Sequence, residues 1–330
     1  MPSLARKAFI AGAGALAASA VGLPAFATEQ LVNNVRVEDD RWLLPGWETL
    51  TDPDAAGMAK TLDLVSETAK MLAAKGIGLL LASIPFKARY CPDLPAGSLA
   101  PAIASRYGTS LAAMQSRGLK TVDLEAALRP VQSAYYPTDQ HWTWDAVDGA
   151  GDALATALRA NWNVPDRGKH EPLQPFVTDK RYGDLATLLP PALRTQIGVE
   201  TYRLRTAYGG DLNGYSEYTG STDPQPKDAQ SVQLVGSSFV RPMWGLPQKL
   251  ANVLGTDVGL TFFNGDAGPY HALLMNLRST LPKRAPTVVV WQMTEANLHL
   301  GPDATGWWGI TSLMSPDFFL SHVQTAINAA

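Results

Sequence analysis

Four short and largely apolar runs, separated by segments with helical periodicity, constrain the fold of this chain more than any other feature. The runs are residues 78–85, 231–235, 258–263 and 287–293. A strand that is apolar along its whole length is typical of a parallel sheet that is covered on both faces. Between the runs, apolar residues recur at helical spacing, as over residues 55–74 and 145–158. Strands that alternate with helices predict an α/β fold with a central parallel sheet.

The composition excludes several classes of protein. Of the 330 residues, 46% are hydrophobic and 17% are charged, and the formal net charge is −3. A nucleic-acid-binding protein would carry a basic face, so we expect no nucleic-acid partner. Cys91 is the only cysteine, which excludes an internal disulfide and a cysteine-rich zinc site. The histidines lack ligand spacing, and we expect neither a metal ion nor another cofactor.

The amino-terminal residues have the pattern of an export signal. Arg6 and Lys7 precede an apolar stretch at residues 8–23, and a small-x-small pattern ends at Ala27. We therefore expect a signal peptide over residues 1–27, cleavage near Ala27, and a mature protein in the periplasm or otherwise exported. An uncleaved membrane anchor is the alternative, but the apolar run is short and rich in small residues.

Residues 28–330 are expected to form a single domain with one irregular insertion. The insertion, at about 161–227, is rich in Pro, Gly, Tyr and Asp, and its periodicity is poor. Such a segment is usually functional or peripheral, and we interpret it as a small subdomain or a set of loops with some strands. Beyond residues 315–317 there is room only for a final helix, so no carboxyl-terminal carbohydrate-binding module is expected.

An acid and a histidine lie two residues apart in an aromatic-rich stretch, residues 135–142. In an extended segment residues i and i+2 point to the same face, so Asp139 can lie alongside the ring of His141. The acid would then fix which ring nitrogen carries the proton. This arrangement is the acid–base half of a hydrolase triad, and it lacks a nucleophile.

The best candidates for the nucleophile follow the strand at residues 231–235. In an open parallel sheet, reactive residues collect at the carboxyl ends of the strands. Gly236 allows a tight turn there, and Ser237 and Ser238 follow it. Backbone N–H groups beyond the turn could face a developing oxyanion. The serines could instead be helix caps, but together with the acid and the histidine they complete a triad.

Two motifs together resemble the alginate O-acetyltransferase family, which contains exported, SGNH-hydrolase-like proteins that acetylate exopolysaccharides. They are Thr138-Asp139-Gln140-His141-Trp142 and Leu234-Val235-Gly236-Ser237-Ser238-Phe239. Weaker matches, including Gly183-Asp184-Leu185, extend the resemblance over about residues 41–297. In this family the histidine motif precedes the serine motif, which is the reverse of ordinary SGNH hydrolases. The resemblance implies an SGNH-hydrolase-like three-layer fold with circularly permuted motif order.

The resemblance also implies roles for the motif residues. By position it puts the nucleophile on Ser238, the base on His141 and the orienting acid on Asp139. It implies transfer of an acetyl group, through an acetyl-serine, to hydroxyls of a polysaccharide, alginate-like or other. The donor is expected to come through a membrane-bound O-acyltransferase. A polysaccharide acetylesterase and a non-catalytic polysaccharide-binding scaffold are the alternatives.

Three further positions are candidates for the oxyanion hole, in addition to the backbone N–H of Ser238. If the permuted family order holds, the loop at Gly265 supplies a second donor. The loop after the last strand would supply a side-chain amide, from Gln292 or Asn297. Each of these residues could equally be an ordinary loop or strand-end residue.

Aromatic side chains are candidates for sugar binding, because flat rings fit the faces of pyranoses. Tyr135, Tyr136 and Trp142 lie next to the expected base, so we expect them to line the sugar site. For Trp307 and Trp308, packing in the core or at the surface explains the sequence equally well.

Two arginines are candidates for binding an acidic polymer. Arg89 and Arg241 follow predicted strand ends and could meet the carboxylate of a uronate. A structural ion pair is the alternative for both residues.

Overall fold

The structure is a computed structural model that describes residues 30–38, 41–48, 54–91, 101–168, 170, 173, 175–204 and 231–329. The signal peptide expected at 1–27 lies outside the described residues, as does the last part of the expected insertion, residues 205–227. In the part of the chain that the structure describes, no helix combines the length and the hydrophobicity needed to cross a membrane.

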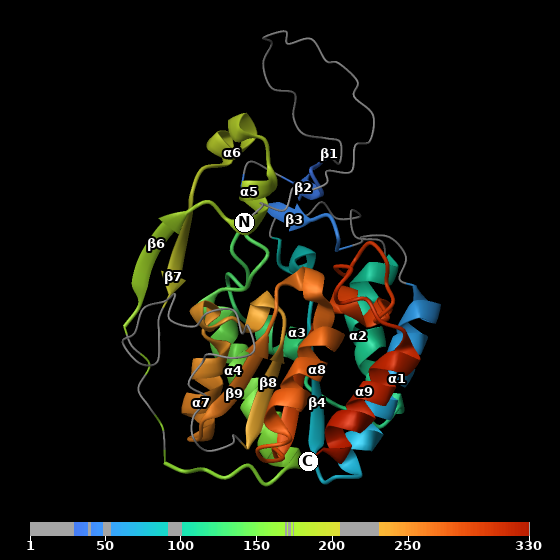
Figure 1. Ribbon diagram of the computed structural model, residues 1–330. Helices are drawn as coiled ribbons and strands as arrows, with labels where there is room; N and C mark the ends of the chain where they lie inside the picture. Colours follow the sequence, from blue (N-terminus) through green and yellow to red (C-terminus); the bar gives the residue numbers. More distant parts are fainter. Residues whose placement is uncertain are drawn as a thin grey trace, which may run out of the picture.

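A five-stranded parallel sheet forms the centre of the molecule, in the order β5-β4-β10-β8-β9 (Figure 1). Its strands are β4 (Gly78–Ile84), β5 (Lys120–Thr121), β8 (Val232–Gly236), β9 (Val258–Phe262) and β10 (Val288–Thr294). The central strand β10 pairs with β4 from Val288 opposite Gly78 to Thr294 opposite Ile84, so the two strands end together. The sheet confirms the predicted parallel α/β architecture.

Helices cover both faces of this sheet and make it the middle of three layers (Figure 1). One layer contains α3 (Leu124–Leu128), α4 (Trp144–Asn161) and α7 (Leu246–Leu254), and the other contains α1 (Ala55–Ala73), α2 (Pro101–Ser116), α8 (Gly268–Thr280) and α9 (Pro316–Asn328). Successive side chains of a strand point to opposite faces, so Val288 and Val290 of β10 pack in the first core. Val289 and Trp291 pack in the second core. An apolar run without alternation is required because both faces are covered.

Two small antiparallel sheets lie beyond the carboxyl ends of the parallel strands (Figure 1). They consist of β1 (Gln30–Val32), β2 (Val35–Val37) and β3 (Leu43–Pro45), and of β6 (Val177–Arg181) and β7 (Glu200–Leu204). The helices α5 (Asp184–Leu188) and α6 (Pro191–Ile197) connect β6 to β7. Residues 177–204 of the expected irregular insertion therefore have regular structure, and we call them the insertion module.

Short 3₁₀ segments follow the parallel strands where the polypeptide turns back toward the helices. They are η1 (Lys87–Tyr90), η2 (Ser238–Val240), η3 (Pro242–Trp244), η4 (Gly265–Ala267) and η5 (Glu295–His299). Because the strands are parallel, their carboxyl ends meet at one edge of the sheet, where ligands bind in open α/β folds. The serine motif and the loops named as oxyanion candidates all lie at this edge.

Candidate active site

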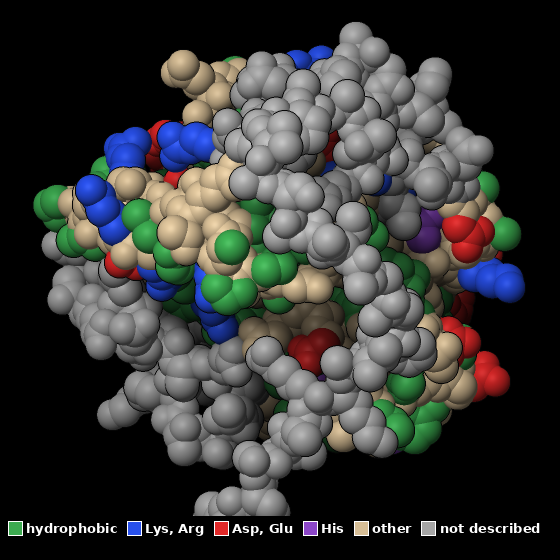
Figure 2. Space-filling model, turned by 90° about the horizontal axis from the view of Figure 1, so that it is seen from above, with side chains coloured by type: hydrophobic (Ala, Val, Ile, Leu, Met, Phe, Trp, Pro, Cys, Tyr) green, Lys and Arg blue, Asp and Glu red, His purple; other side chains and the backbone are tan. Residues whose placement is uncertain are grey.

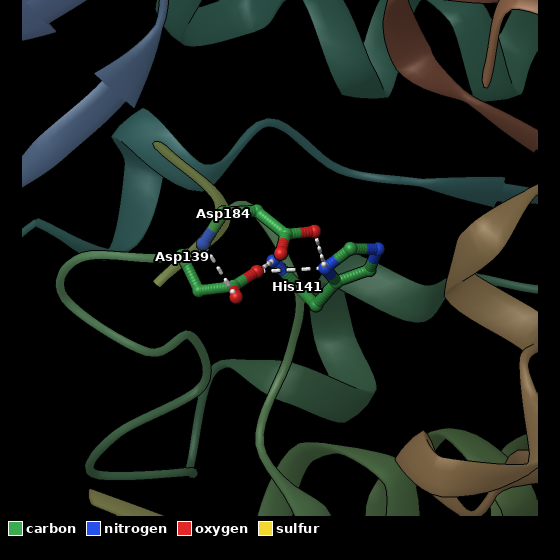
Figure 3. Close-up of side chains that lie close together, drawn as sticks. All are labelled: Asp139, His141 and Asp184. Carbon is green, nitrogen blue, oxygen red and sulfur yellow. Dashed lines mark hydrogen bonds and ion pairs between the residues drawn. The ribbon is translucent and has the colours of Figure 1, made fainter. Parts of the chain in front are cut away.

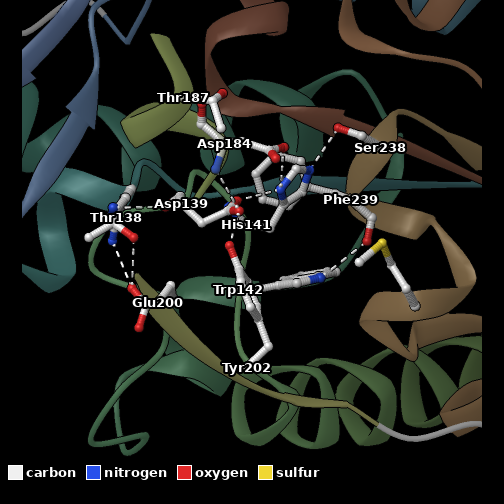
Figure 4. A network of polar contacts seen from close by, with 12 residues as sticks. Thr138, Asp139, His141, Trp142, Asp184, Thr187, Glu200, Tyr202, Ser238 and Phe239 are labelled. Atoms are coloured by element: carbon white, nitrogen blue, oxygen red, sulfur yellow. Dashed lines mark hydrogen bonds and ion pairs between the residues drawn. The ribbon is translucent and has the colours of Figure 1, made fainter. Parts of the chain in front are cut away.

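The structure brings Asp139, His141 and Ser238 into one hydrogen-bonded chain (Figure 4). The Nε2 atom of His141 lies 2.8 Å from Oγ of Ser238, and its Nδ1 atom lies 2.7 Å from Oδ1 of Asp139. An ionised carboxylate can only accept a hydrogen bond, so Nδ1 carries the ring proton. The unprotonated Nε2 then accepts the proton of the serine hydroxyl, which is the geometry of a general base.

The loop that carries the acid and the histidine is held by its own backbone and by the serine segment. Oδ1 of Asp139 accepts the backbone N–H of His141 at 2.9 Å, a local bond typical of aspartate in turns. The N–H of Tyr136 donates to the carbonyl of His141 at 3.2 Å, which closes the loop. The indole of Trp142 donates to the carbonyl of Phe239 at 3.1 Å and joins the loop to η2.

The carboxylate of Asp139 is fully buried and accepts four hydrogen bonds. Oδ1 takes both donors of His141, and Oδ2 accepts the hydroxyl of Tyr202 at 2.6 Å and the backbone N–H of Asp184 at 3.0 Å. Burial alone would raise the pKa of Asp139, but the charge and hydrogen bond of His141, with the other donors, hold that pKa well below its usual value. Asp139 therefore stays ionised.

The insertion module makes further bonds to the residue before the acid. Oε2 of Glu200 accepts both the backbone N–H and the hydroxyl of Thr138, each at 3.0 Å. The N–H of Ala186 donates to the carbonyl of Thr138 at 3.2 Å. A Cβ atom at Gly183 would collide with that carbonyl, so glycine permits the close approach of α5.

Lys87 holds the same loop from the side of the sheet. Its side chain is fully buried at the end of β4, and Nζ donates to the carbonyls of Leu43, Pro137 at 2.6 Å and Asp139 at 2.8 Å. Burial lowers the pKa of Lys87 to about 7, while the neighbouring carboxylates of Asp139 and Glu48 oppose that shift. One ammonium group thus satisfies three buried carbonyls in two separate segments.

Asp184 places a second carboxylate beside the histidine (Figure 3). Its Oδ2 lies 3.5 Å from Nδ1 of His141, and its side chain is 55% exposed. Partial burial, followed by the charge of Asp139, raises the pKa of Asp184. Asp139, His141 and Asp184 lie close enough to share a cation. However, all the lone pairs of Asp139 are engaged by donors and Nδ1 carries a proton, so the group is suited to proton transfer rather than to metal binding.

The ring of His141 is 1% exposed and is oriented by aromatic neighbours. The indole of Trp244 stacks on it at 4.5 Å between ring centroids, with an interplanar angle of 20°. The ring of Phe239 lies at 4.9 Å. With its ring position fixed, the imidazole can exchange a proton with Ser238 without reorganisation of the site.

A pocket of about 500 Å³ opens in front of Ser238. Its walls come from the ends of the parallel strands, from the β1–β3 sheet and from the loop before α9. They include Asn34, Trp47, Gln140, Gly265, Asp266, Asn297, Trp307 and Trp308. Figure 2, a view onto this edge of the molecule, shows acidic atoms at the bottom of a hollow. The serine is therefore accessible, whereas the histidine and the acid behind it are buried.

Three of the expected oxyanion donors border this pocket. Ser238, whose backbone N–H stands at the start of η2, lines the pocket. Gly265 also lines the pocket and has open space on its Cα. The Oδ1 atom of Asn297 accepts the N–H of Thr294 at 3.0 Å, which fixes the amide and leaves Nδ2 for a ligand.

Gln292 does not lie where an oxyanion donor is needed, and this expectation is corrected. Its side chain is 1% exposed and does not line the pocket. Oε1 accepts the backbone N–H of Ser237 at 2.8 Å and the hydroxyl of Ser237 at 3.0 Å. A Cβ atom at Gly236 would collide with this amide. Gln292 therefore supports the turn before the nucleophile from behind.

The three aromatics next to the histidine are core residues, so the expectation that they line a sugar site is wrong. Tyr135, Tyr136 and Trp142 are 0%, 5% and 1% exposed. The hydroxyl of Tyr135 donates to the carbonyl of Pro85 at 2.6 Å, which points the side chain inward. Trp47, Trp307 and Trp308 line the pocket instead, and Trp307 is 39% exposed.

The two arginines have structural partners and do not line the pocket. The Nη2 atom of Arg89 lies 2.7 Å from Oε1 of Glu295, and the two side chains are 7% and 0% exposed. This buried pair joins the ends of β4 and β10, so a role for Arg89 in binding a uronate is corrected. The guanidinium of Arg241 lies over the ring of Phe262 and donates to Oδ1 of Asn264 at 3.4 Å.

Sequence reasoning missed several residues that hold the site together. Tyr202 has one usable signal in the sequence, because Tyr202 and Leu204 alternate with polar residues, as in a strand with one covered face. Lys87 has another signal. It comes three residues after the end of an apolar strand, where a side chain is difficult to expose, so its charge needs a buried partner. Asp184 was noted only as part of a weak motif, and nothing in the sequence connects it with His141.

The fold and the arrangement at the carboxyl edge of the sheet place the protein in the SGNH-hydrolase-like class. The family model described as "SGNH hydrolase-like domain, acetyltransferase AlgX" matches residues 35–295. The chain belongs to this AlgX/AlgJ-like family, which confirms the resemblance seen in its two motifs.

Several relatives of known name or structure are similar to this chain. A probable alginate O-acetylase AlgJ of Pseudomonas aeruginosa is 27% identical over 286 residues, which cover 82% of this chain and 71% of that protein. The O-acetyltransferase domain of Pseudomonas putida AlgJ has a TM-score of 0.65 and 24% identity, covering 88% of this chain and 99% of that one. Pseudomonas aeruginosa AlgX has a TM-score of 0.53 and 18% identity, covering 88% and 65%. The two solved structures support the fold.

Proposed function

We propose that this protein is an exported O-acetyltransferase that moves an acetyl group, through an acetyl-serine, to hydroxyls of a polysaccharide. The observation that carries the proposal is the chain from Ser238 through His141 to Asp139, with separations of 2.8 and 2.7 Å at the floor of an open pocket. Membership of an acetyltransferase family and the alginate O-acetylase name of the Pseudomonas relative support acetyl as the group and polysaccharide as the acceptor.

The first half of the reaction forms the acetyl-enzyme. Nε2 of His141 takes the proton from Oγ of Ser238 while that oxygen attacks the acetyl carbonyl, and Asp139 stabilises the imidazolium. The carbonyl oxygen becomes an oxyanion, for which the N–H groups of Ser238 and Gly265 and Nδ2 of Asn297 are the proposed donors. The imidazolium then gives its proton to the leaving group.

The second half transfers the acetyl group to the acceptor. A sugar hydroxyl enters the pocket, gives its proton to Nε2 of His141 and attacks the acetyl-serine. Collapse of the second tetrahedral intermediate returns the proton to Oγ of Ser238. Because His141 is buried and its ring is fixed, the same nitrogen serves both steps.

A polysaccharide acetylesterase is the second candidate. The two activities differ only in whether water or a sugar hydroxyl attacks the acetyl-serine. The openness of the pocket, which admits water to Ser238, favours this alternative. The acetyltransferase family supports transfer.

The cellular setting of the reaction follows from the sequence. A signal peptide at residues 1–27 would place the rest of the chain, as one catalytic domain, outside the cytoplasm. Acetyl groups would then have to cross the membrane, and a membrane-bound O-acyltransferase is the proposed source. These points are part of the proposal.

The decisive experiment measures acetylation of the protein itself. The purified protein, lacking residues 1–27, is mixed with an activated acetyl ester, and the intact mass and the modified residue are determined by mass spectrometry. The expected result is one acetyl group on Ser238, with none in Ser238→Ala or His141→Ala.

A matched control is available in the neighbouring serine. Ser237→Ala removes a hydroxyl that is bonded to Gln292 but keeps its backbone N–H. It should still form the acetyl-enzyme. Acetylation that persists in Ser238→Ala would contradict the assignment of Ser238 as the nucleophile. An acetyl-enzyme that yields only acetate, with every polysaccharide acceptor, would establish the esterase instead.

A further inference from the structure

The pocket in front of Ser238 is lined by side chains that suit an uncharged sugar. Three carboxamides, those of Asn34, Gln140 and Asn297, border it and can donate to or accept from sugar hydroxyls. Trp47 and Trp307 supply aromatic surface at the same walls. Amide groups combined with flat apolar rings can bind the hydroxyls and the faces of a pyranose without any charge.

Trp307 is held in an exposed position by its own loop. Gly306 adopts a φ of +85°, which glycine takes without strain, and turns the polypeptide before the two tryptophans. The indole of Trp308 is 6% exposed and donates to the carbonyl of Gly301 at 2.7 Å, so it anchors the loop. The ring of Trp307 is 39% exposed, which leaves it available for a ligand.

The described lining of the pocket contains no lysine, arginine or histidine, and its one charged residue is Asp266. Asp184, 3.5 Å from Nδ1 of His141, adds a second exposed carboxylate near the reacting atoms. In Figure 2, many of the Lys and Arg side chains in view lie on the side of β6 and β7. A sugar carboxylate in this pocket would therefore meet Asp266 and no cation in the described lining, while the charges of Arg181 and Arg241 act on Asp184.

The arginines around the site already have partners, including Arg241, which donates to Oδ1 of Asn264 at 3.4 Å. Arg89 is buried against Glu295, and Arg181 and Arg203 of the insertion module pair with Asp179 and Asp145. Recognition of a carboxylate in proteins relies on such guanidinium groups, often through two parallel hydrogen bonds.

The segment that follows the insertion module in the sequence also carries more acidic than basic residues. Residues 205–230 contain two basic residues, Arg205 and Lys227, against four acidic ones, Asp211, Glu217, Asp223 and Asp228. Wherever it lies, this segment adds net negative charge.

We infer that the acceptor bound beside Ser238 is an uncharged glycan, with a pyranose ring on Trp307 and hydroxyls on the neighbouring carboxamides, rather than a polyuronate. This inference rests on the proposed acetyltransferase function. The inferred acceptor differs from alginate, the polymer in the name of the Pseudomonas relative, because every sugar residue of alginate carries a carboxylate.

The test compares acceptors on a common acetyl-enzyme. The protein is acetylated with the activated ester, and uncharged oligosaccharides of glucose, galactose and N-acetylglucosamine are offered beside oligomannuronate and oligoguluronate. Acetylated product is measured by mass spectrometry. At least one uncharged acceptor should exceed both uronates by tenfold or more in kcat/KM. A uronate that equals or exceeds all uncharged acceptors would overturn the inference.

Variants of the pocket provide an independent readout. Trp307→Ala should reduce transfer to the best uncharged acceptor at least tenfold relative to acetyl-enzyme formation. Ile310→Ala, which truncates an 87% exposed side chain nearby that does not line the pocket, should change it less than twofold. Asp266→Lys should raise transfer to the uronates. Equal effects of the Trp307 and Ile310 substitutions would count against the aromatic platform.

The failure of this inference can be distinguished from failure of the proposed function. If no acetyl-Ser238 forms, the proposed function fails before any acceptor is involved. If acetyl-Ser238 forms and passes its acetyl group only to a polyuronate, the function stands and the inference is wrong.

Discussion

Two regions of the molecule hold the loop that carries Asp139 and His141, and they differ in how they do so. The parallel sheet brings residues that follow its strands, such as Ser238 after β8 and Lys87 after β4, to one edge. The insertion module contributes Tyr202, Glu200 and the N–H of Asp184 from outside that sheet. The sheet thus presents Ser238, the proposed nucleophile, whereas the insertion module mainly holds Asp139 in place. Position along an edge is a property of the fold class, whereas the second set of contacts comes from residues outside the parallel sheet.

The acid on which both regions converge should show the largest effect. Asp139→Asn replaces an acceptor of four hydrogen bonds by a group that can also donate, so His141 would lose the tautomer that accepts from Ser238. The rate of acetyl-enzyme formation should fall by about 10³ to 10⁴. Stopped-flow measurement with the activated ester checks this. Asp145→Asn, at an exposed carboxylate, is the control, and a loss below tenfold in Asp139→Asn would contradict the role.

Replacing Lys87, through which the sheet side holds this loop, should lower the stability of the folded protein as well as the rate. Lys87→Met leaves the carbonyls of Leu43, Pro137 and Asp139 without their donor, and should lower the free energy of unfolding by about 3 kcal/mol. Urea denaturation measures the change. Lys120→Met, at an exposed lysine, is the matched control and should cost little.

The same variant gives a pH dependence whose sign is fixed by burial. The pKa of Lys87 is about 7 in the folded protein, against an ordinary value of 10.5. Between these values the unfolded chain binds a proton that the folded chain does not, so the lysine makes stability rise with pH. The difference in unfolding free energy between wild type and Lys87→Met should therefore widen from about pH 7 toward 10.5. A constant difference would show that the lysine keeps an ordinary pKa.

Removing a donor of the insertion module should have a smaller effect on stability and a clear effect on rate. Tyr202→Phe deletes the hydroxyl that donates to Oδ2 of Asp139 at 2.6 Å, and should slow acetyl-enzyme formation about tenfold, equivalent to about 1.4 kcal/mol. Loss of that donor also raises the pKa of Asp139, so activity should be lost at a higher pH on the acid side. Tyr182→Phe, on the same module, is the control. If Tyr202→Phe has the rate of wild type and loses activity at the same acidic pH, the insertion module does not support Asp139.

The smallest effect is expected for the second carboxylate. Asp184→Asn keeps the backbone N–H that donates to Asp139 and removes only the charge near the imidazolium, so the rate should fall about two- to fivefold. Asp179→Asn makes the same change of charge on β6, away from His141, and should leave the rate unchanged. A loss in Asp184→Asn as large as that in Tyr202→Phe would show that the charge, not the backbone, is the main contribution of α5.

The outcome for individual residues shows what the sequence could reveal. The separation of Asp139 and His141 and the strand before Ser238 were enough to bring three groups together, because each depends on local periodicity or on the common edge of parallel strands. Gln292 and Tyr135 were misplaced because alternation along a strand or loop does not tell which face is covered. The amide of Gln292 turns behind Ser237, and Tyr135 turns inward to Pro85.

The sequence by itself determined the parallel α/β fold, the family, and the two motifs that contain Asp139, His141 and Ser238. These features follow from apolar periodicity and from short motifs, which are local properties of the chain. Only the tertiary structure decided that Lys87 joins two segments, that Tyr202 and Asp184 complete the surroundings of Asp139, and that Trp307 rather than Trp142 faces the pocket. Those contacts join residues many positions apart, and burial of a polar group has to be satisfied by whichever partner the folded chain brings within reach.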